Sequence, residues 1–176
     1  MKRLWILSAL LLSAIVMMPF GLAQTDKDDD DEAQDPAALA KALGPVKVTL
    51  EAGLSAATAQ GKPISAKFEM EDGQLQLSVY TEKGGKFFEV VVDHDKGTVS
   101  KSEPITEGDD LSDAKAQSGA MAKAKRSLRD AVAKAVAANK GFRAVSAIPE
   151  DKDGHATVTV MLLNGQDWKT ISQPLD

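Results

Sequence analysis

The apolar pattern changes its period within residues 61–79, which read GKPISAKFEMEDGQLQLSV. In residues 64–70 every second residue is apolar, which is the pattern of a strand with one buried face. Asp72-Gly73 predicts a tight turn, because a two-residue hairpin needs residues that tolerate positive φ. The alternation resumes in residues 75–79. The stretch therefore predicts two antiparallel strands joined by a hairpin.

A short helix precedes these strands. Leu50, Leu54 and Ala57 are spaced four and three residues apart, so they share one helical face. Thr49 is a typical N-cap residue and Gly61 a typical terminator.

Two more strands are expected downstream. Gly84-Gly85 predicts a second turn, and residues 86–93 alternate again with Phe88, Val90 and Val92 on one face. A turn over residues 93–97 leads into a short strand around Val99. Residues 45–105 therefore form a unit in which a helix is followed by an antiparallel meander.

The same order of elements recurs about 80 residues later. A longer helix is expected from Ser112 to Gly141, with fraying or a kink at Ser118-Gly119 near its beginning. Three strands follow at residues 142–148, 156–162 and 168–174, separated by turns at Asp153-Gly154 and Asn164-Gly165. The sequence thus predicts an α+β protein of two units, residues 45–105 and 106–176, each a helix packed on a three- to four-stranded antiparallel sheet.

Three segments of the first unit resemble the PepSY family, namely Val48–Ala57, Gly61–Glu69 and Phe88–Val99. That family shows a capped helix, a glycine before the first strand, and a strand that ends in Asp shortly before a Gly-x-Val turn. Here Asp93 and Gly97 match the last feature, whereas the second unit has no closing Asp and Gly after Trp168. The resemblance implies a cystatin-like helix on a sheet and a non-enzymatic binding or regulatory protein, with a separate envelope or secreted peptidase as a candidate target.

The first 23 residues have the pattern of a signal peptide. Lys2 and Arg3 precede an apolar run over residues 4–18, and small residues stand at Gly21 and Ala23. We expect cleavage after Ala23 and a periplasmic or secreted protein of bacterial type, without stable membrane insertion after cleavage. An uncleaved anchor is the alternative. The chain has no cysteine, which excludes disulfides and a lipid attached to cysteine.

Residues 24–44 are expected to be an acidic, largely disordered segment. Residues 24–36 contain seven acidic residues against one lysine and almost no apolar residue. This segment is interpreted as a solvated spacer. The alternative function for the whole protein is a calcium binder or sensor, which would use this Asp run or the Asp93-x-Asp95-x-Gly97 turn. That turn has Pro104 where a calcium loop needs its bidentate glutamate.

Motifs for catalysis are missing. The two histidines, His94 and His155, lie in predicted turns and do not form a metal pair, and the chain has no nucleophile elbow, phosphate loop or dinucleotide fingerprint. The basic stretch 113–140 contains no aromatic residue for base stacking, which disfavours nucleic acid as a partner. We therefore assign no catalytic, cofactor-binding or metal-binding residue and expect a non-enzymatic protein whose partner is another envelope or secreted protein.

Overall fold

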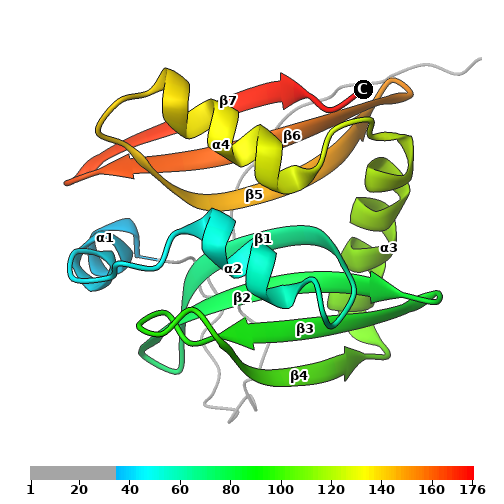
Figure 1. The fold of residues 1–176 in the computed structure, drawn as a ribbon, viewed down its shortest axis with the longest axis horizontal. Helices are drawn as coiled ribbons and strands as arrows, with labels where there is room; N and C mark the ends of the chain where they lie inside the picture. The colour runs from blue at the N-terminus through cyan, green and yellow to red at the C-terminus, as the bar shows by residue number, and fades with distance from the viewer. Residues whose placement is uncertain (1–34) are drawn as a thin grey trace, which may run out of the picture. The chain divides into compact units, whose positions relative to one another are not determined.

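The computed structural model describes residues 35–176, which form an α+β fold with one seven-stranded antiparallel sheet (Figure 1). The helices are α1 (Pro36–Leu43), α2 (Leu50–Ala57), α3 (Gly108–Lys123) and α4 (Leu128–Ala138). The strands are β1 (Lys62–Glu71), β2 (Gln74–Lys83), β3 (Lys86–Val92), β4 (Val99–Ile105), β5 (Arg143–Lys152), β6 (His155–Asn164) and β7 (Asp167–Pro174). The expected signal peptide and the acidic residues 24–34 lie outside the described residues.

The two meanders share a single sheet of order β4-β3-β2-β1-β5-β6-β7. β1 pairs antiparallel with β5, with Ala66 opposite Ala147 and Lys67 opposite Ser146. The expectation of two sheets with three or four strands each is therefore wrong. The physical reason is that a buried strand edge must pair its backbone N–H and C=O groups, and each meander supplies the partner of the other.

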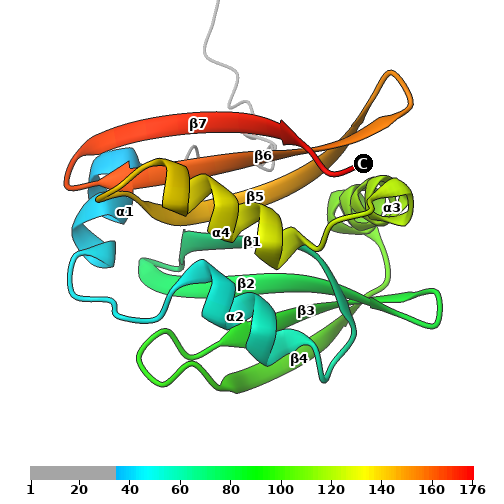
Figure 2. The ribbon, with the colours of Figure 1, turned by 45° about the horizontal axis from the view of Figure 1, so that its top comes forward.

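α2 and α4 lie side by side on one face of the sheet (Figure 2). α2 packs on β1, β2 and β3, and α4 packs on β5 and β6. The alternating apolar residues of the strands are buried beneath them, as the sequence pattern predicts. They are Ile64, Ala66, Phe68, Leu77, Val79, Val90, Val92, Ala156, Val158, Val160 and Leu162.

The predicted hairpins are confirmed. Asp72-Gly73, Gly84-Gly85 and Asp153-Gly154 all have positive φ and connect strands paired on either side of them. The last hairpin differs by one residue from the expected Asn164-Gly165 turn. Asn164 pairs with Asp167, so the two turn residues are Gly165 and the residue after it.

The single helix expected from Ser112 to Gly141 is two helices. The chain turns away after Lys123 because Ala124 adopts an extended conformation, and α4 then starts afresh. Ser127 caps α4 by accepting a hydrogen bond from the backbone N–H of Asp130 at 3.1 Å. Ser112 does not begin a helix, because it lies inside α3, where its hydroxyl donates to Gly108 O.

The break between α3 and α4 is held by the C-terminal end of the chain. The backbone N–H groups of Lys125 and Arg126 donate to Leu175 O at 2.8 and 3.0 Å. The Leu175 side chain is fully buried. This distant contact supplies partners for backbone groups that a continuous helix would have paired internally.

One described helix, α1, precedes residue 45, where the first unit is expected to begin. Asp35 caps α1, because its carboxylate accepts from Ala37 N at 2.9 Å, and Pro36 stands at the first helical position. Leu39 and Leu43 are buried against the rest of the fold. No helix among residues 35–176 is both long enough and apolar enough to cross a membrane.

Candidate binding surface

The face of the sheet opposite α2 and α4 is covered in part by α3 alone among the described elements. α3 packs across β5 and β1, where Ser65 Oγ donates to Gln117 Oε1 at 2.5 Å and Ala114 is buried. Two hollows of about 640 and 230 Å³ flank α3 and are lined partly by Asp113 and Ile148. No other described element covers this face, and we refer to it as the open face.

A hydrogen-bonded group of polar side chains occupies the open face of β1, β2 and β3. Glu89 Oε1 accepts from Ser78 Oγ at 2.9 Å and from Gln76 Nε2 at 3.1 Å. One strand further along, Glu69 Oε2 lies 2.5 Å from Lys67 Nζ. Ser78 is fully buried and Glu69 is 7% exposed, so these groups are held in fixed positions.

The two carboxylates of this group, Glu69 and Glu89, repel each other. Burial raises the pKa of the Glu89 carboxyl above its ordinary value, the hydrogen bond from Ser78 lowers it, and the nearby Glu69 raises it again. Burial, followed by Glu69 and Glu89, also raises the pKa of the Tyr80 phenol. Lys67 Nζ lies 5.7 Å from the centre of the Tyr80 ring. The arrangement therefore keeps negative charge close together on a half-buried surface.

The open face of the second half of the sheet has a different character. The residues opposite the core positions of β6 and β7 are mostly hydroxyl-bearing and uncharged, namely Thr157, Thr159, Met161, Thr170 and Ser172. Met161 is 38% exposed and is the exposed large hydrophobic residue of the described chain. Uncharged surface with an exposed methionine is typical of protein contact areas.

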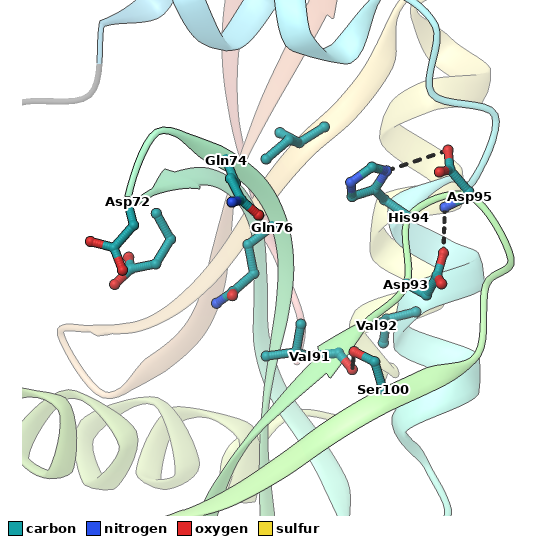
Figure 3. A pocket seen from close by; sticks show the side chains of 11 residues that line it. Asp72, Gln74, Gln76, Val91, Val92, Asp93, His94, Asp95 and Ser100 are labelled. Atoms are coloured by element: carbon teal, nitrogen blue, oxygen red, sulfur yellow. Dashed lines mark hydrogen bonds and ion pairs between the residues drawn. The ribbon is translucent and has the colours of Figure 1, made fainter.

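The Asp93 turn lines a cleft of about 430 Å³ between the β1–β2 turn and the β3–β4 turn (Figure 3). Asp93 Oδ1 accepts from the backbone N–H groups of Asp95 and Lys96, both at 2.9 Å, and Oδ2 lies 3.2 Å from Lys96 Nζ. The backbone donors of Lys96 and Asp95 lower the pKa of Asp93. This carboxylate therefore stabilises the turn between β3 and β4 to which it belongs.

This geometry gives no support to calcium binding at the Asp93 turn. Both oxygens of Asp93 already have donors, and no group of three or more acidic or histidine residues among residues 35–176 is placed to hold a metal ion. His94 Nδ1 lies 3.5 Å from Asp95 Oδ1, on the same side of the cleft. The Asp run of the alternative lies outside the described residues.

His155 lies far from His94 in the fold. It is the first residue of β6, directly after the Asp153-Gly154 turn, and its Nδ1 lies 2.7 Å from Asp176 Oδ2. That contact lowers the pKa of Asp176. The histidine thus ties the C-terminal end of the chain to a hairpin, which is a structural role.

A further hollow of about 370 Å³ lies on the helix side, between the end of α2 and the start of α4. Leu54, Met121 and Leu128 form its apolar lining, and Lys62 and Arg129 stand beside them. Lys62 Nζ donates to Met121 O at 3.0 Å. This hydrogen bond joins the last turn of α3 to the start of β1.

Two features of the structure were not predicted from the sequence. One is the polar group described above, formed by Gln76, Ser78 and Glu89 with Lys67 and Glu69, which we call the Glu89 group. The Gly84-Gly85 turn fixes the hairpin register, which places Tyr80 opposite Glu89 and Ser78 opposite Val91, so these side chains could have been placed on one face from the sequence. Arg143 gave no local signal. Its guanidinium donates to three carbonyl groups about 100 positions earlier in the chain, which only the folded structure reveals.

Comparisons with protein-family models, with curated proteins and with solved structures find no match for this chain. The resemblance to the PepSY family therefore rests on the sequence segments alone.

Proposed function

We propose that this chain is an exported, non-enzymatic binding protein of PepSY type, which contacts a separate envelope or secreted protein through the open face of its sheet. The observation that carries the proposal is the Glu89 group. Burial raises the pKa of the Glu89 carboxyl, so its ionised form is costly to keep at this position, and a partner that brings donors or cations would relieve that cost. A peptidase is the candidate target that the family resemblance suggests.

The order of elements supports the PepSY reading of both halves. α2 precedes β1 to β4, and α4 precedes β5 to β7, so each half has a helix followed by an antiparallel meander. We interpret the halves as two degenerate copies of one unit, joined through β1 and β5. The periplasmic or secreted location follows from the signal-peptide pattern of residues 1–23 and is part of the same proposal.

Site-specific photocrosslinking tests this function. A photoreactive residue replaces Glu103, which is exposed on the open face of β4, and a matched control replaces Ala133, which is exposed on α4. We expect one envelope or secreted protein to be crosslinked from position 103 and not from position 133. If the captured protein is a peptidase, its activity should change when the purified chain is added. Absence of any crosslink from position 103, or equal crosslinks from both positions, would contradict the proposal.

A further inference from the structure

The hollow between the end of α2 and the start of α4, which we call the α2–α4 hollow, carries one sign of charge. Its volume is about 370 Å³, and the two helices that flank it lie side by side (Figure 2). Lys62 and Arg129 are the charged residues of its lining, and none of the described residues that line it is acidic. Because one helix ends and another begins here, their opposite dipoles offset each other. The two cations therefore decide the charge of the hollow.

Both cations keep donors for a ligand. Lys62 Nζ donates to Met121 O at 3.0 Å, and two of the three N–H donors of an ammonium remain. The Arg129 guanidinium makes only long contacts, at 3.5 Å to Ser55 Oγ and 3.9 Å to Asp130 Oδ1. Asp130 is exposed and does not line the hollow, so this ion pair is weak. With Asp130 counted, the two cations still leave a net positive charge.

The inner lining of the hollow is mostly apolar. Its floor consists of Leu54, Met121 and Leu128, which belong to the hydrophobic core, and Pro63 is half-buried at its side. The aliphatic stems of the two cations extend this apolar surface toward the rim. An apolar floor below two cations matches a molecule that has a hydrocarbon part and an anionic head.

We propose that the α2–α4 hollow binds a small amphipathic carboxylate, whose head pairs with Lys62 and Arg129 and whose short hydrocarbon chain lies on the apolar floor. An ammonium and a guanidinium both form charge-assisted hydrogen bonds with a carboxylate. The volume is at the lower end of the range of small-molecule sites, whereas a stable contact with another protein needs a much larger surface. None of the lining residues belongs to the Glu89 group, so this inference is independent of the proposed function.

The probe is octanoate, titrated into the purified, isotope-labelled protein and followed by the chemical shifts of the backbone amides. Acetate has the same carboxylate without the chain, and octylamine has the same chain with a cation at its head. We expect octanoate to bind about tenfold or more tightly than either control. Burial of about two additional methylene groups gives this ratio over acetate, and repulsion from Lys62 and Arg129 disfavours octylamine. The amides that shift should include those of Thr58 and Leu128, which line the hollow.

Arg129→Met is the test variant and Lys134→Met its matched control. Both residues are exposed on α4, but only Arg129 lines the hollow. Arg129→Met removes one cation and keeps an apolar side chain, so it should weaken octanoate binding about three- to fivefold, whereas Lys134→Met should leave binding unchanged. A second variant, Thr58→Phe, places a ring at an exposed lining position. It should weaken octanoate binding about tenfold or more, because the ring takes the space of the hydrocarbon chain.

Several results would overturn the inference. Octylamine that binds as tightly as octanoate would show that the cations do not select the ligand. Equal effects of Arg129→Met and Lys134→Met, or octanoate binding that Thr58→Phe leaves unchanged, would place the ligand outside the hollow. A short peptide with a C-terminal leucine is the last comparison. If it binds more tightly than octanoate, the occupant is the end of a partner chain and the assignment to a small molecule is wrong.

Discussion

Replacing Arg143 with methionine is expected to lower the free energy of unfolding by about 3–4 kcal/mol. The guanidinium of Arg143, at the start of β5, donates to Leu43 O, Val46 O and Val48 O at 2.9, 2.8 and 2.9 Å. It also lies 5.4 Å from the centre of the Phe68 ring. One side chain of the second half therefore holds α1 and the segment that leads into α2.

The magnitude follows from the groups that would lose their donors. A hydrogen bond from a charged donor contributes roughly 1–1.5 kcal/mol or more, and three carbonyl groups would be left without this donor. The cation over the Phe68 ring adds about 0.5–1 kcal/mol, but methionine recovers part of the packing. Burial lowers the pKa of Arg143, which indicates that desolvation already offsets part of the gain. A loss of about 3–4 kcal/mol is large beside the 5–15 kcal/mol that stabilise an ordinary domain.

Urea denaturation followed by circular dichroism measures this change. Arg143→Lys should fall between the parent protein and Arg143→Met, because a single ammonium cannot reach all three carbonyl oxygens. Arg129→Met is the matched control on α4. Its guanidinium is exposed and lies 3.9 Å from Asp130 and 3.5 Å from Ser55, so the control should change stability by less than about 0.5 kcal/mol.

The reasoning would be refuted by a small effect. If Arg143→Met costs less than about 1 kcal/mol, or no more than Arg129→Met, the three carbonyl groups are satisfied without Arg143. The attachment of α1 would then depend on the packing of its buried residues Leu39, Ala40 and Leu43.

Three further predictions concern single positions. Gly61→Ala should destabilise the fold by about 1–3 kcal/mol, because the added Cβ would lie 2.8 Å from the backbone oxygen of Glu82. The control is Gly119→Ala in α3, where the added Cβ meets no atom within 4 Å. In the same denaturation assay this variant should stabilise the fold by up to about 1 kcal/mol. Burial raises the pKa of Glu89 in the fold, so its protonated form favours folding, and that contribution is lost as pH rises from the ordinary glutamate value of 4.5 toward the folded value. Melting curves of Glu89→Gln should therefore gain on the parent protein as pH rises above 4.5, and a constant difference would contradict the raised pKa. Asp93→Asn should leave the heat of a calcium titration unchanged, because the carboxylate already accepts from its own turn, and a heat lost in this variant would restore the calcium alternative.

Most strands and turns could be predicted because their signals are local. The alternation from Ile64 to Met70 and the Asp72-Gly73 turn encode one hairpin within a few residues, and the structure contains it. The one-residue difference at Gly165 shows the limit of this reading, since Asn164 could serve either as a turn residue or as the last residue of β6.

The break between α3 and α4 could not be predicted for a physical reason. Residues 113–140 are rich in alanine and charged residues that favour a helix, and no proline or strong terminator stands at Ala124. The break is stabilised by Leu175, about 50 residues later, whose carbonyl accepts the freed N–H groups. Tertiary contacts therefore override local preference at this position.

The sequence by itself determined the α+β class, the positions of the hairpins, and the face of each strand that is buried. These properties depend on side-chain periodicity and on turn residues, which act over a few positions. Only the tertiary structure decided that β1 and β5 join the meanders into one sheet and that Arg143 donates to the carbonyl groups at the end of α1 and before α2. Those outcomes depend on which backbone groups meet across the fold, and a local pattern carries no information about pairing between distant segments.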